Sequence, residues 1–249
     1  MIENISAVII TNNAAETIKV TMDSLSDFKE VVIYDSGSID NTLEIVTNYT
    51  NARLFNGEFL GFGPTKNFAS NLAINDWIFS IDADESISNK LCLHLSEIDL
   101  ESKLIGEIRR DNYFMGKEMR VAGWGRDKLI RLFNRTEFRF SDRQVHEKVE
   151  VDSSARKIAL RGSILHNSIN NLSQTLEKAN LYSELYAEEN NKHYPIWVIM
   201  CKTGYSFLRT YVLQRGFLAG WRGLVLSISN SIGVFYKYIK VYVRQKQKK

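Results

Sequence analysis

The chain has 249 residues, of which 44% are hydrophobic and 24% charged, the balance of a soluble globular protein. This length can bury one substantial core, and it favours one large domain with an appendage over two equal domains. The two cysteines, Cys92 and Cys201, lie far apart without a CxxC motif, which argues against a disulfide or a cysteine metal site. The N-terminus lacks the basic segment of a signal peptide, so the cytoplasm is the expected compartment.

The formal net charge of +3 conceals a strong asymmetry along the chain. Residues 195–249 contain no Asp or Glu and ten Lys or Arg. Residues 1–194 contain 22 basic and 29 acidic residues, a formal charge of −7. An acidic body that continues into a segment of charge +10 predicts that the C-terminal end meets a polyanion.

The first 100 residues alternate short apolar, β-branched runs with amphipathic segments. Such an order predicts an α/β fold, a mostly parallel sheet with helices on both faces. The expected strands are ISAVII (5–10), VVIY (31–34), ARLFNGE (52–58) and DWIFSI (76–81). The expected helices lie within 14–25, from 40 to about 49, and within 61–75.

Polar residues follow three of these strands where each strand ends. They are Thr11-Asn12, Asp35-Ser36 and the acidic group Asp82, Asp84 and Glu85. In parallel sheets, ligands bind outside the carboxyl ends of the strands. The three polar groups therefore predict a ligand site at one edge of the sheet.

The pattern changes after residue 100. Segments up to 166 alternate apolar and polar residues and predict strands of a mixed region, whereas 172–191 and the last 55 residues predict amphipathic helices. We expect a domain of residues 1–170, with a ligand-binding half at 1–100 and a second half at 101–170. Residues 171–249 would form a helical, basic extension.

The longest uncharged run of this extension, 223–236, has 14 residues. A spanning helix needs about 20 apolar residues, so we expect an interfacial helix on an anionic membrane surface instead. Packing against the body of the protein or against a second subunit is the alternative, which leaves a homo-oligomer open. Nothing resembles a nucleic-acid-binding motif, so no nucleic-acid partner is expected.

The same polar groups lie within motifs that occur in order over nearly the whole chain. The motifs are SAVIITNN, VVIYDSGSIDNTLEI, GFGPTKNFA, WIFSIDADE, RLFNR, VHEKV, LH at 165–166, and FLAGWRGL followed by FYKYIK. With them the chain resembles the family 2 glycosyltransferases of the GT-A (Rossmann-like) fold. Within that family it resembles the lipopolysaccharide-core β-1,4-glucosyltransferase subgroup. It departs from the pattern at Ile39, usually Thr, and at Ala219, usually an acid.

The resemblance implies a nucleotide-sugar donor and a DxD motif at Asp82 and Asp84. It places Asp82 nearer the nucleoside and Asp84 on a divalent cation. Carboxylate oxygens suit Mg²⁺ or Mn²⁺, which would stabilise the charge of the leaving diphosphate. His166 resembles a late metal ligand of such enzymes, although a buried, satisfied histidine remains the alternative.

The resemblance also assigns residues to the donor. Thr11 and Asn12 would line the nucleobase, with Asp35 and Ser36 on the nucleobase or ribose; Asp35 could instead cap the turn that follows it. We expect Lys66 and Asn67 at the start of a helix, where they would meet phosphate. Solvation of Lys66 and capping by Asn67 are the alternatives.

The resemblance implies that the catalytic base lies in the motif QVHEKV. In the subgroup the Glu after His occupies the position of a catalytic Asp, which assigns Glu147, while His146 competes because its pKa suits a base. An exposed strand would also explain this pair. The roles of Arg131, structural or facing the acceptor, and of Trp124, stacking on sugar or packing, stay open.

These expectations combine into an inverting glycosyltransferase that moves a hexose, glucose from UDP-glucose, to a lipid-linked saccharide such as the inner core of lipopolysaccharide. It would work as a peripheral protein on the cytoplasmic face of the inner membrane. The alternatives are a non-catalytic nucleotide-sugar-binding scaffold and a transferase for another surface glycan or a protein. Nucleotidyl transfer is disfavoured, because TNNAAET lacks a glycine-rich, basic loop.

Overall fold

A computed structural model describes residues 1–125, 127–142, 147–169 and 172–247. The chain divides into two compact units. The first, here called the sheet unit, comprises residues 1–111 and 127–166, and the second, the helical unit, comprises residues 112–126 and 167–249.

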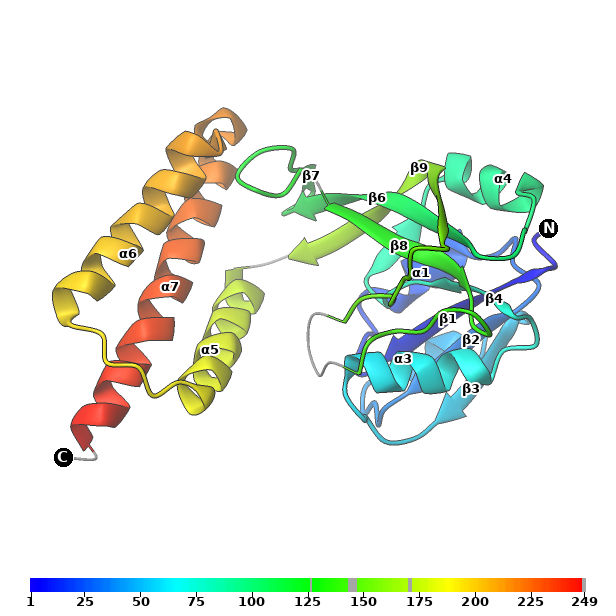
Figure 1. Cartoon of the computed structure of the whole chain (residues 1–249), viewed down its shortest axis with the longest axis horizontal. Helices are drawn as coiled ribbons and strands as arrows, with labels where there is room; N and C mark the ends of the chain where they lie inside the picture. Colours follow the sequence, from blue (N-terminus) through cyan, green and yellow to red (C-terminus); the bar gives the residue numbers. More distant parts are fainter. Residues whose placement is uncertain (126, 143–146, 170–171, 248–249) are drawn as a thin grey trace. The chain divides into compact units, whose positions relative to one another are not determined.

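Within the described residues, one sheet of nine strands has the order β3-β2-β1-β4-β8-β6-β9-β5, and β7 pairs with β6 (Figure 1). The strands are β1 (Ile5–Thr11), β2 (Val31–Asp35), β3 (Ala52–Asn56), β4 (Trp77–Ser80), β5 (Glu85–Ile87), β6 (Leu104–Phe114), β7 (Lys117–Glu118), β8 (Asp127–Asn134) and β9 (Arg156–Ile169).

The parallel part of the sheet is its N-terminal part. Strand β1 pairs in parallel with both β2 and β4, and β2 pairs in parallel with β3. Strand β8 then joins β4 in antiparallel orientation, and β6 joins β8 in the same way. The predicted α/β fold is confirmed, with parallel pairing in the first 100 residues and the expected mixed region after them.

Helices cover both faces of the parallel strands, as predicted. Successive residues of a strand point to opposite faces, so Val8 and Ile9 belong to different apolar clusters. Ile9 packs in one cluster with Met22 of a helix, and Val8 packs in the other with Ala69 of another helix. The helices of this unit are α1 (Ile18–Ser24), α2 (Thr42–Val46), α3 (Phe62–Asn71) and α4 (Asn89–Glu97).

The helical unit contains α5 (Leu172–Glu189), α6 (Ile196–Leu208) and α7 (Trp221–Gln247), and both α5 and α6 pack along α7 (Figure 1). A π-helical turn, η1 (Arg209–Leu213), and a 3₁₀ turn, η2 (Gly216–Ala219), connect α6 to α7. Phe114, Met119 and Ala122 of the β6–β7 region pack on Leu226 of α7. Residues 172–247 are thus mainly helical, as expected, while the boundary of the extension at residue 171 stays a prediction.

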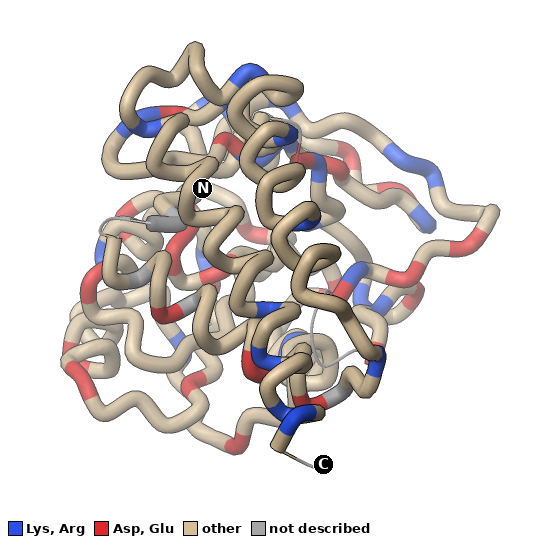
Figure 2. Tube along the Cα trace, turned by 90° about the vertical axis from the view of Figure 1, so that its left-hand side faces the viewer, with Lys and Arg blue, Asp and Glu red and all other residues tan. Residues whose placement is uncertain are grey.

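Lys and Arg residues recur along the C-terminal part of α7 (Figure 2). Two of them, Lys240 and Arg244, pair with Glu184 of α5. In the portions of the chain that the structure describes, no helix is both long and apolar enough to cross a membrane.

Candidate functional site

The three acids after β4 lie on one tight turn that leads into β5. Ile81 is still buried, and the Glu85 amide then donates to the Asp82 carbonyl at 3.0 Å. In return the Asp82 amide donates to Oε2 of Glu85 at 3.1 Å. The turn thus brings the carboxylates of Asp82 and Glu85 together at the end of a buried strand, where like charges repel unless cations compensate them.

Arg131 of β8 supplies the compensating charge. Its side chain is 5% exposed, and Nη2 donates to Oδ2 of Asp82 at 2.8 Å and to both carboxylate oxygens of Glu85 at 2.7 Å. The antiparallel pairing of β8 with β4 carries Arg131 to the turn. Of the two roles left open for this arginine, the structure shows that it neutralises the acidic turn.

The buried charges shift one another's pKa values. Burial raises the pKa of Asp82, but the charges of Arg131 and Lys66 outweigh it and hold that pKa well below its usual value of 3.8. Burial raises the pKa of Glu85 above its usual 4.5; Arg131 opposes this rise and the neighbouring Asp82 charge adds to it. Burial lowers the pKa of Arg131, but the charges of Asp82 and Glu85 raise it by more. The net shift is upward, so this arginine stays charged.

Lys66 links the acidic turn to the predicted base. Its Nζ, almost completely buried, lies 2.8 Å from Oδ1 of Asp82 and 2.7 Å from Oε1 of Glu147. The prediction that Lys66 lies at a helix start is wrong, because α3 begins at Phe62 and Lys66 falls in its second turn. The helix dipole acts within the first turn, so contacts with two carboxylates position this ammonium instead.

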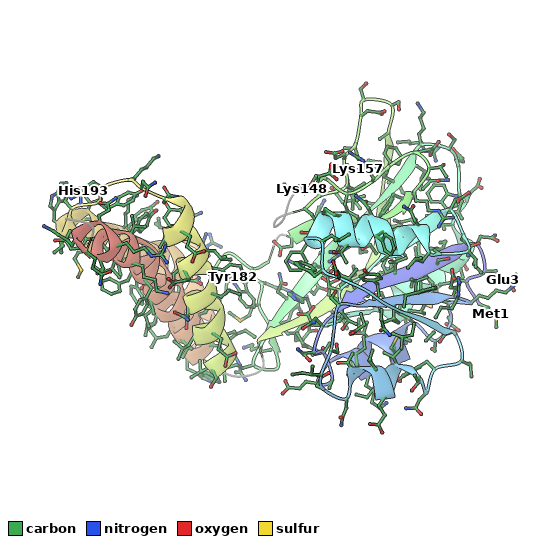
Figure 3. All side chains as sticks on the ribbon, turned by 90° about the horizontal axis from the view of Figure 1, so that it is seen from below. Met1, Glu3, Lys148, Lys157, Tyr182 and His193 are labelled. Atoms are coloured by element: carbon green, nitrogen blue, oxygen red, sulfur yellow. The ribbon has the colours of Figure 1, made fainter. Side chains whose placement is uncertain are left out.

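These side chains line one cavity of about 440 Å³. Cations outnumber acids in its lining, which includes Arg110, Lys128, Lys148 and Lys157; Figure 3 labels the last two. A cavity with an excess of positive charge suits an anionic ligand such as a diphosphate. His146, the competing base, lies outside the described residues.

Asp84 and His166 form a second pair beside the cavity acids. Nε2 of His166 lies 3.2 Å from Oδ2 of Asp84, because β9 pairs with β5 and sets His166 opposite Glu85. Asp82, the third predicted ligand, is bound to Lys66 and Arg131 instead. Among the described residues, no group of three or more His, Cys, Asp and Glu side chains could by itself hold a metal ion.

The pair still fits a divalent cation by its chemistry. A carboxylate oxygen and an imidazole nitrogen that lie within contact distance are both donors for Mn²⁺, and the carboxylate is one for Mg²⁺. Any ion held there would need further ligands from a substrate or from water, which is common for cations bound to phosphates.

The polar ends of β1 and β2 lie side by side, as predicted. Thr11 stands opposite Asp35 in the strand register, and the Ser36 amide donates to the Thr11 carbonyl at 2.9 Å. The side-chain Nδ2 of Asn12 donates to the Ser36 carbonyl at 2.9 Å. Thr11 is 5% exposed, and its Oγ1 finds no hydrogen-bond partner in the described part of the chain.

Asp35 caps the turn after β2. Its Oδ1 accepts from the amides of Gly37 and Ser38 at 2.9 and 2.8 Å, and its Oδ2 accepts from the Ser38 hydroxyl. The carboxylate is buried, so a nucleoside contact would have to replace one of these bonds. The structure thus shows the turn-capping alternative for Asp35.

Asn67 likewise binds the protein itself. Its Nδ2 donates to the Phe140 carbonyl at 2.9 Å, and its Oδ1 accepts from the Phe140 amide at 2.8 Å. These two hydrogen bonds fix the backbone of Phe140, which lines the cavity. Asn67 therefore positions the cavity wall, and it caps no helix because it lies inside α3.

The structure shows that Arg131 and Glu85, both named from the sequence without a partner, bind each other within the acidic cluster. One signal in the sequence points to the arginine, since Arg131 interrupts the apolar strand KLIRLF. A charge between apolar strand residues indicates a buried partner of opposite sign.

A family model described as glycosyl transferase family 2 matches residues 6–163. An uncharacterized glycosyltransferase of Rickettsia typhi is 27% identical over 96% of this chain and 87% of its own length. The lipopolysaccharide core biosynthesis glycosyltransferase LpsC of Rhizobium meliloti is 28% identical over 96% of this chain and 92% of its own. The S. aureus TarS structure aligns with a TM-score of 0.44 and 14% identity over 86% of this chain and 45% of that chain, too distant a likeness to transfer residue roles. The matched family model covers most of the sheet, the acidic turn and the cavity, and this chain belongs to glycosyl transferase family 2 and is a glycosyltransferase.

Proposed function

We propose that this glycosyltransferase moves glucose from UDP-glucose, with inversion, to a saccharide of the lipopolysaccharide core. The observation that carries the proposal is the cavity in which Lys66 joins Asp82 to Glu147, with Arg131 behind the acidic turn. The name of the LpsC relative supports the choice of acceptor.

Glu147 would act as the base. It takes the proton of the acceptor hydroxyl while that oxygen attacks the anomeric carbon from the face opposite the diphosphate. The bond from the anomeric carbon to the diphosphate oxygen breaks, and the diphosphate leaves with the electron pair. Lys66 is placed between Glu147 and Asp82, where its charge would stabilise the departing diphosphate.

Asp84 and His166 would hold Mg²⁺ or Mn²⁺, which stabilises negative charge on the diphosphate when bound. Thr11 and Asn12 would contact the nucleobase, since the Thr11 hydroxyl is buried without a partner among the described residues. Asp35 and Ser36 would shape the adjoining wall, and Asp82 would face the nucleoside side of the cavity.

For the rest of the chain, we propose a catalytic domain of residues 1–170 and an extension of 171–249 that lies on the cytoplasmic face of the inner membrane. The extension exposes large apolar side chains beside basic ones and has no acidic residue after 194. Exposed examples are Trp197, Leu208, Leu213, Leu218 and Trp221. Apolar and basic side chains together favour an anionic membrane surface.

Two substitutions test the catalytic assignments with purified protein and Mn²⁺. Glu147→Gln should lower glucosyl transfer by about 10²-fold or more because the base is lost, while calorimetry shows UDP-glucose binding unchanged. Asp84→Ala should abolish the Mn²⁺-dependent part of UDP binding. The controls are Glu150→Gln and Asp142→Ala, whose side chains are 57% and 68% exposed and bind only Arg139 among the described ion pairs.

Full transfer by Glu147→Gln would remove the base assignment, and unchanged Mn²⁺ dependence in Asp84→Ala would remove the metal assignment. A wild-type protein that binds UDP-sugars but hydrolyses or transfers none would instead support the scaffold alternative.

A further inference from the structure

The helical unit contains a cavity of its own, of about 610 Å³. Three segments of this unit build it: the loop of residues 119–125, the end of α6 with η1, and the middle of α7. The family model ends at residue 163, so it assigns nothing to α6 or α7.

The cavity is lined by cations without carboxylates. Lys202, Arg209 and Lys237 line it, and no Asp or Glu does among the described residues. Lys202 lies 5.0 Å from the centre of the Tyr238 ring, and Lys237 lies 4.0 Å from that of Tyr186 and 5.9 Å from that of Tyr238. No ion pair of the described residues involves any of the three cations. Such a surface attracts an anion, because no fixed negative charge competes for it.

Aromatic rings and hydrogen-bonding groups complete the lining. Trp124, Tyr205 and Tyr238 present ring surface, while Gln214 and Asn230 offer amides. Aromatic faces beside amide donors and acceptors match a sugar, whose C–H faces are apolar and whose hydroxyls need partners.

The loop that carries Trp124 is rigidly built. Gly123 has φ +86°, and a Cβ on Gly125 would lie 2.4 Å from the Arg120 carbonyl oxygen. The Ala122 residue also has a positive φ, of 58°, and its amide donates to the Gln214 carbonyl at 2.8 Å. Backbone conformations of this kind persist only where surrounding contacts hold them, and they cluster at binding sites.

The π turn η1 shapes the opposite wall. The Gln214 amide donates to the Arg209 carbonyl at 2.8 Å, a bond between residues five apart. In a π turn such residues come onto one face, whereas an α-helix would separate them. The turn therefore brings Arg209 and Gln214 into the same cavity, and single π turns of this kind are frequent at functional sites.

From the uncompensated cations, the aromatic wall and the strained loop, we infer that this cavity binds a sugar that carries a phosphate or carboxylate group. Lys202, Arg209 and Lys237 would bind the anion, and Trp124 and Tyr205 would stack on the ring. The binding site itself is argued from the cavity alone. That the bound sugar is part of the acceptor rests on the proposed function. The inference then names the acceptor class, an anionic rather than a neutral saccharide.

Binding experiments with the full chain test this inference without any transfer reaction. The probes are glucose 6-phosphate, glucuronate and glucose, titrated by NMR or calorimetry. Glucose 6-phosphate or glucuronate should bind at least about tenfold more tightly than glucose, because charge-assisted hydrogen bonds are the strong ones. Preference for the phosphate or for the carboxylate identifies the anion; equal binding of all three overturns the inference.

Variants locate the binding in the cavity. The double substitution Lys202→Gln/Lys237→Gln should weaken binding of the preferred anion by about tenfold. Lys246→Gln removes one positive charge from an exposed position of α7 outside the cavity and should leave binding within twofold. Tyr205→Ala, at a side chain that is 61% exposed, should weaken binding without a change in the circular dichroism spectrum. Equal effects of the double variant and the Lys246 control would overturn the inference.

UDP-glucose hydrolysis, measured on the same proteins, separates the two proposals. If the wild-type protein binds the anionic sugar but hydrolyses no nucleotide sugar, the proposed function is contradicted and the proposed binding site stands. If the protein is active but the cavity substitutions do not change its anion binding, the proposed function stands and the proposed binding site is contradicted.

Discussion

The two units of this glycosyltransferase differ in what compensates the cations of their cavities. In the sheet unit, Lys66 and Arg131 are buried, and each contacts carboxylates of the same unit. In the helical unit, the cavity cations Lys202, Arg209 and Lys237 have no carboxylate partner among the described residues. A buried charge needs a partner supplied by the fold, whereas a charge at a solvent-accessible cavity can be compensated by a ligand. The buried cations Lys66 and Arg131 therefore bind carboxylates of the protein, whereas the cations of the helical unit's cavity remain available to an anionic ligand.

The largest expected difference between the units is in stability. Arg131→Met removes the buried cation that Asp82 and Glu85 share; Asp82 keeps Lys66 and Glu85 keeps Arg110 at 3.4 Å. We expect the free energy of unfolding to fall by about 3–5 kcal/mol. Arg209→Met removes an exposed arginine and should change it by less than about 0.5 kcal/mol. Urea unfolding followed by circular dichroism measures both. Similar losses in the two variants would contradict the contrast between the units.

The next largest effect concerns activity within the sheet unit. Lys66→Gln removes the buried cation that joins Asp82 to Glu147 and should lower kcat/KM for the nucleotide sugar by about 10²–10³-fold. Lys128→Gln removes the same charge from the same cavity, but its side chain is 67% exposed, so we expect a change of less than about threefold. Equal losses would show that only the total charge of the cavity matters.

The acidic turn should show two opposite pH dependences. The depressed pKa of Asp82 stabilises the fold above its usual 3.8, and this contribution is lost as the pH falls below that value. The raised pKa of Glu85 contributes stability below its usual 4.5, which is lost as the pH rises through the raised pKa.

Calorimetric Tm values across this pH range test both signs. The Tm deficit of Asp82→Asn relative to the wild type should shrink as the pH falls below 3.8. The Tm of Glu85→Gln relative to the wild type should rise as the pH increases above 4.5. Parallel pH profiles of the two variants would contradict the pKa directions.

The smallest expected effect concerns Thr11. Its buried hydroxyl lacks a hydrogen-bond partner among the described residues, unlike the buried charges of Lys66 and Arg131 in the same unit. Thr11→Val should keep or raise the free energy of unfolding by up to about 1 kcal/mol and should weaken UDP binding. The matched control is Thr21→Val, which removes a 2.9 Å bond to the Ala83 carbonyl and should cost about 1–3 kcal/mol. A comparable loss for Thr11→Val would show that its hydroxyl has a partner within the fold.

Much of the fold could be predicted from local patterns. Apolar runs such as 5–10 and 31–34 form buried strands because a strand covered on both faces needs apolar residues throughout. Their polar ends meet because parallel strands end at the same edge, which sets Thr11 opposite Asp35. The pattern predicts a helix within 61–75, and α3 forms at 62–71, but the pattern does not fix its first residue, so Lys66 lies in the second turn rather than at the helix start.

The candidate site was only partly predictable, because its contacts join distant residues. Lys66 meets Asp82 across 16 positions of sequence and Glu147 across 81, while Arg131 meets Asp82 across 49. The donor contacts of Asp35 and Asn67 stay predictions; the structure shows that both side chains bind within the protein, Asp35 to the turn of residues 37–38 and Asn67 to Phe140. Asp35 forms the local bonds that short polar side chains often make with nearby backbone. The Asn67–Phe140 bonds instead join residues 73 positions apart, and a pattern of residue types does not reveal them.

The sequence by itself determined the family, the alternation of strands and helices, the acidic stretch after a buried strand and the separation of charge along the chain. Each of these follows from the order of residue types and from the short-range periodicity of strands and helices. Only the tertiary structure decided how those charges are compensated: Arg131 behind the acidic turn, Lys66 between two carboxylates, and three cations without a carboxylate in the helical unit. The physical reason is that compensation depends on distance and burial, and both arise when strands and helices far apart in the chain pack together.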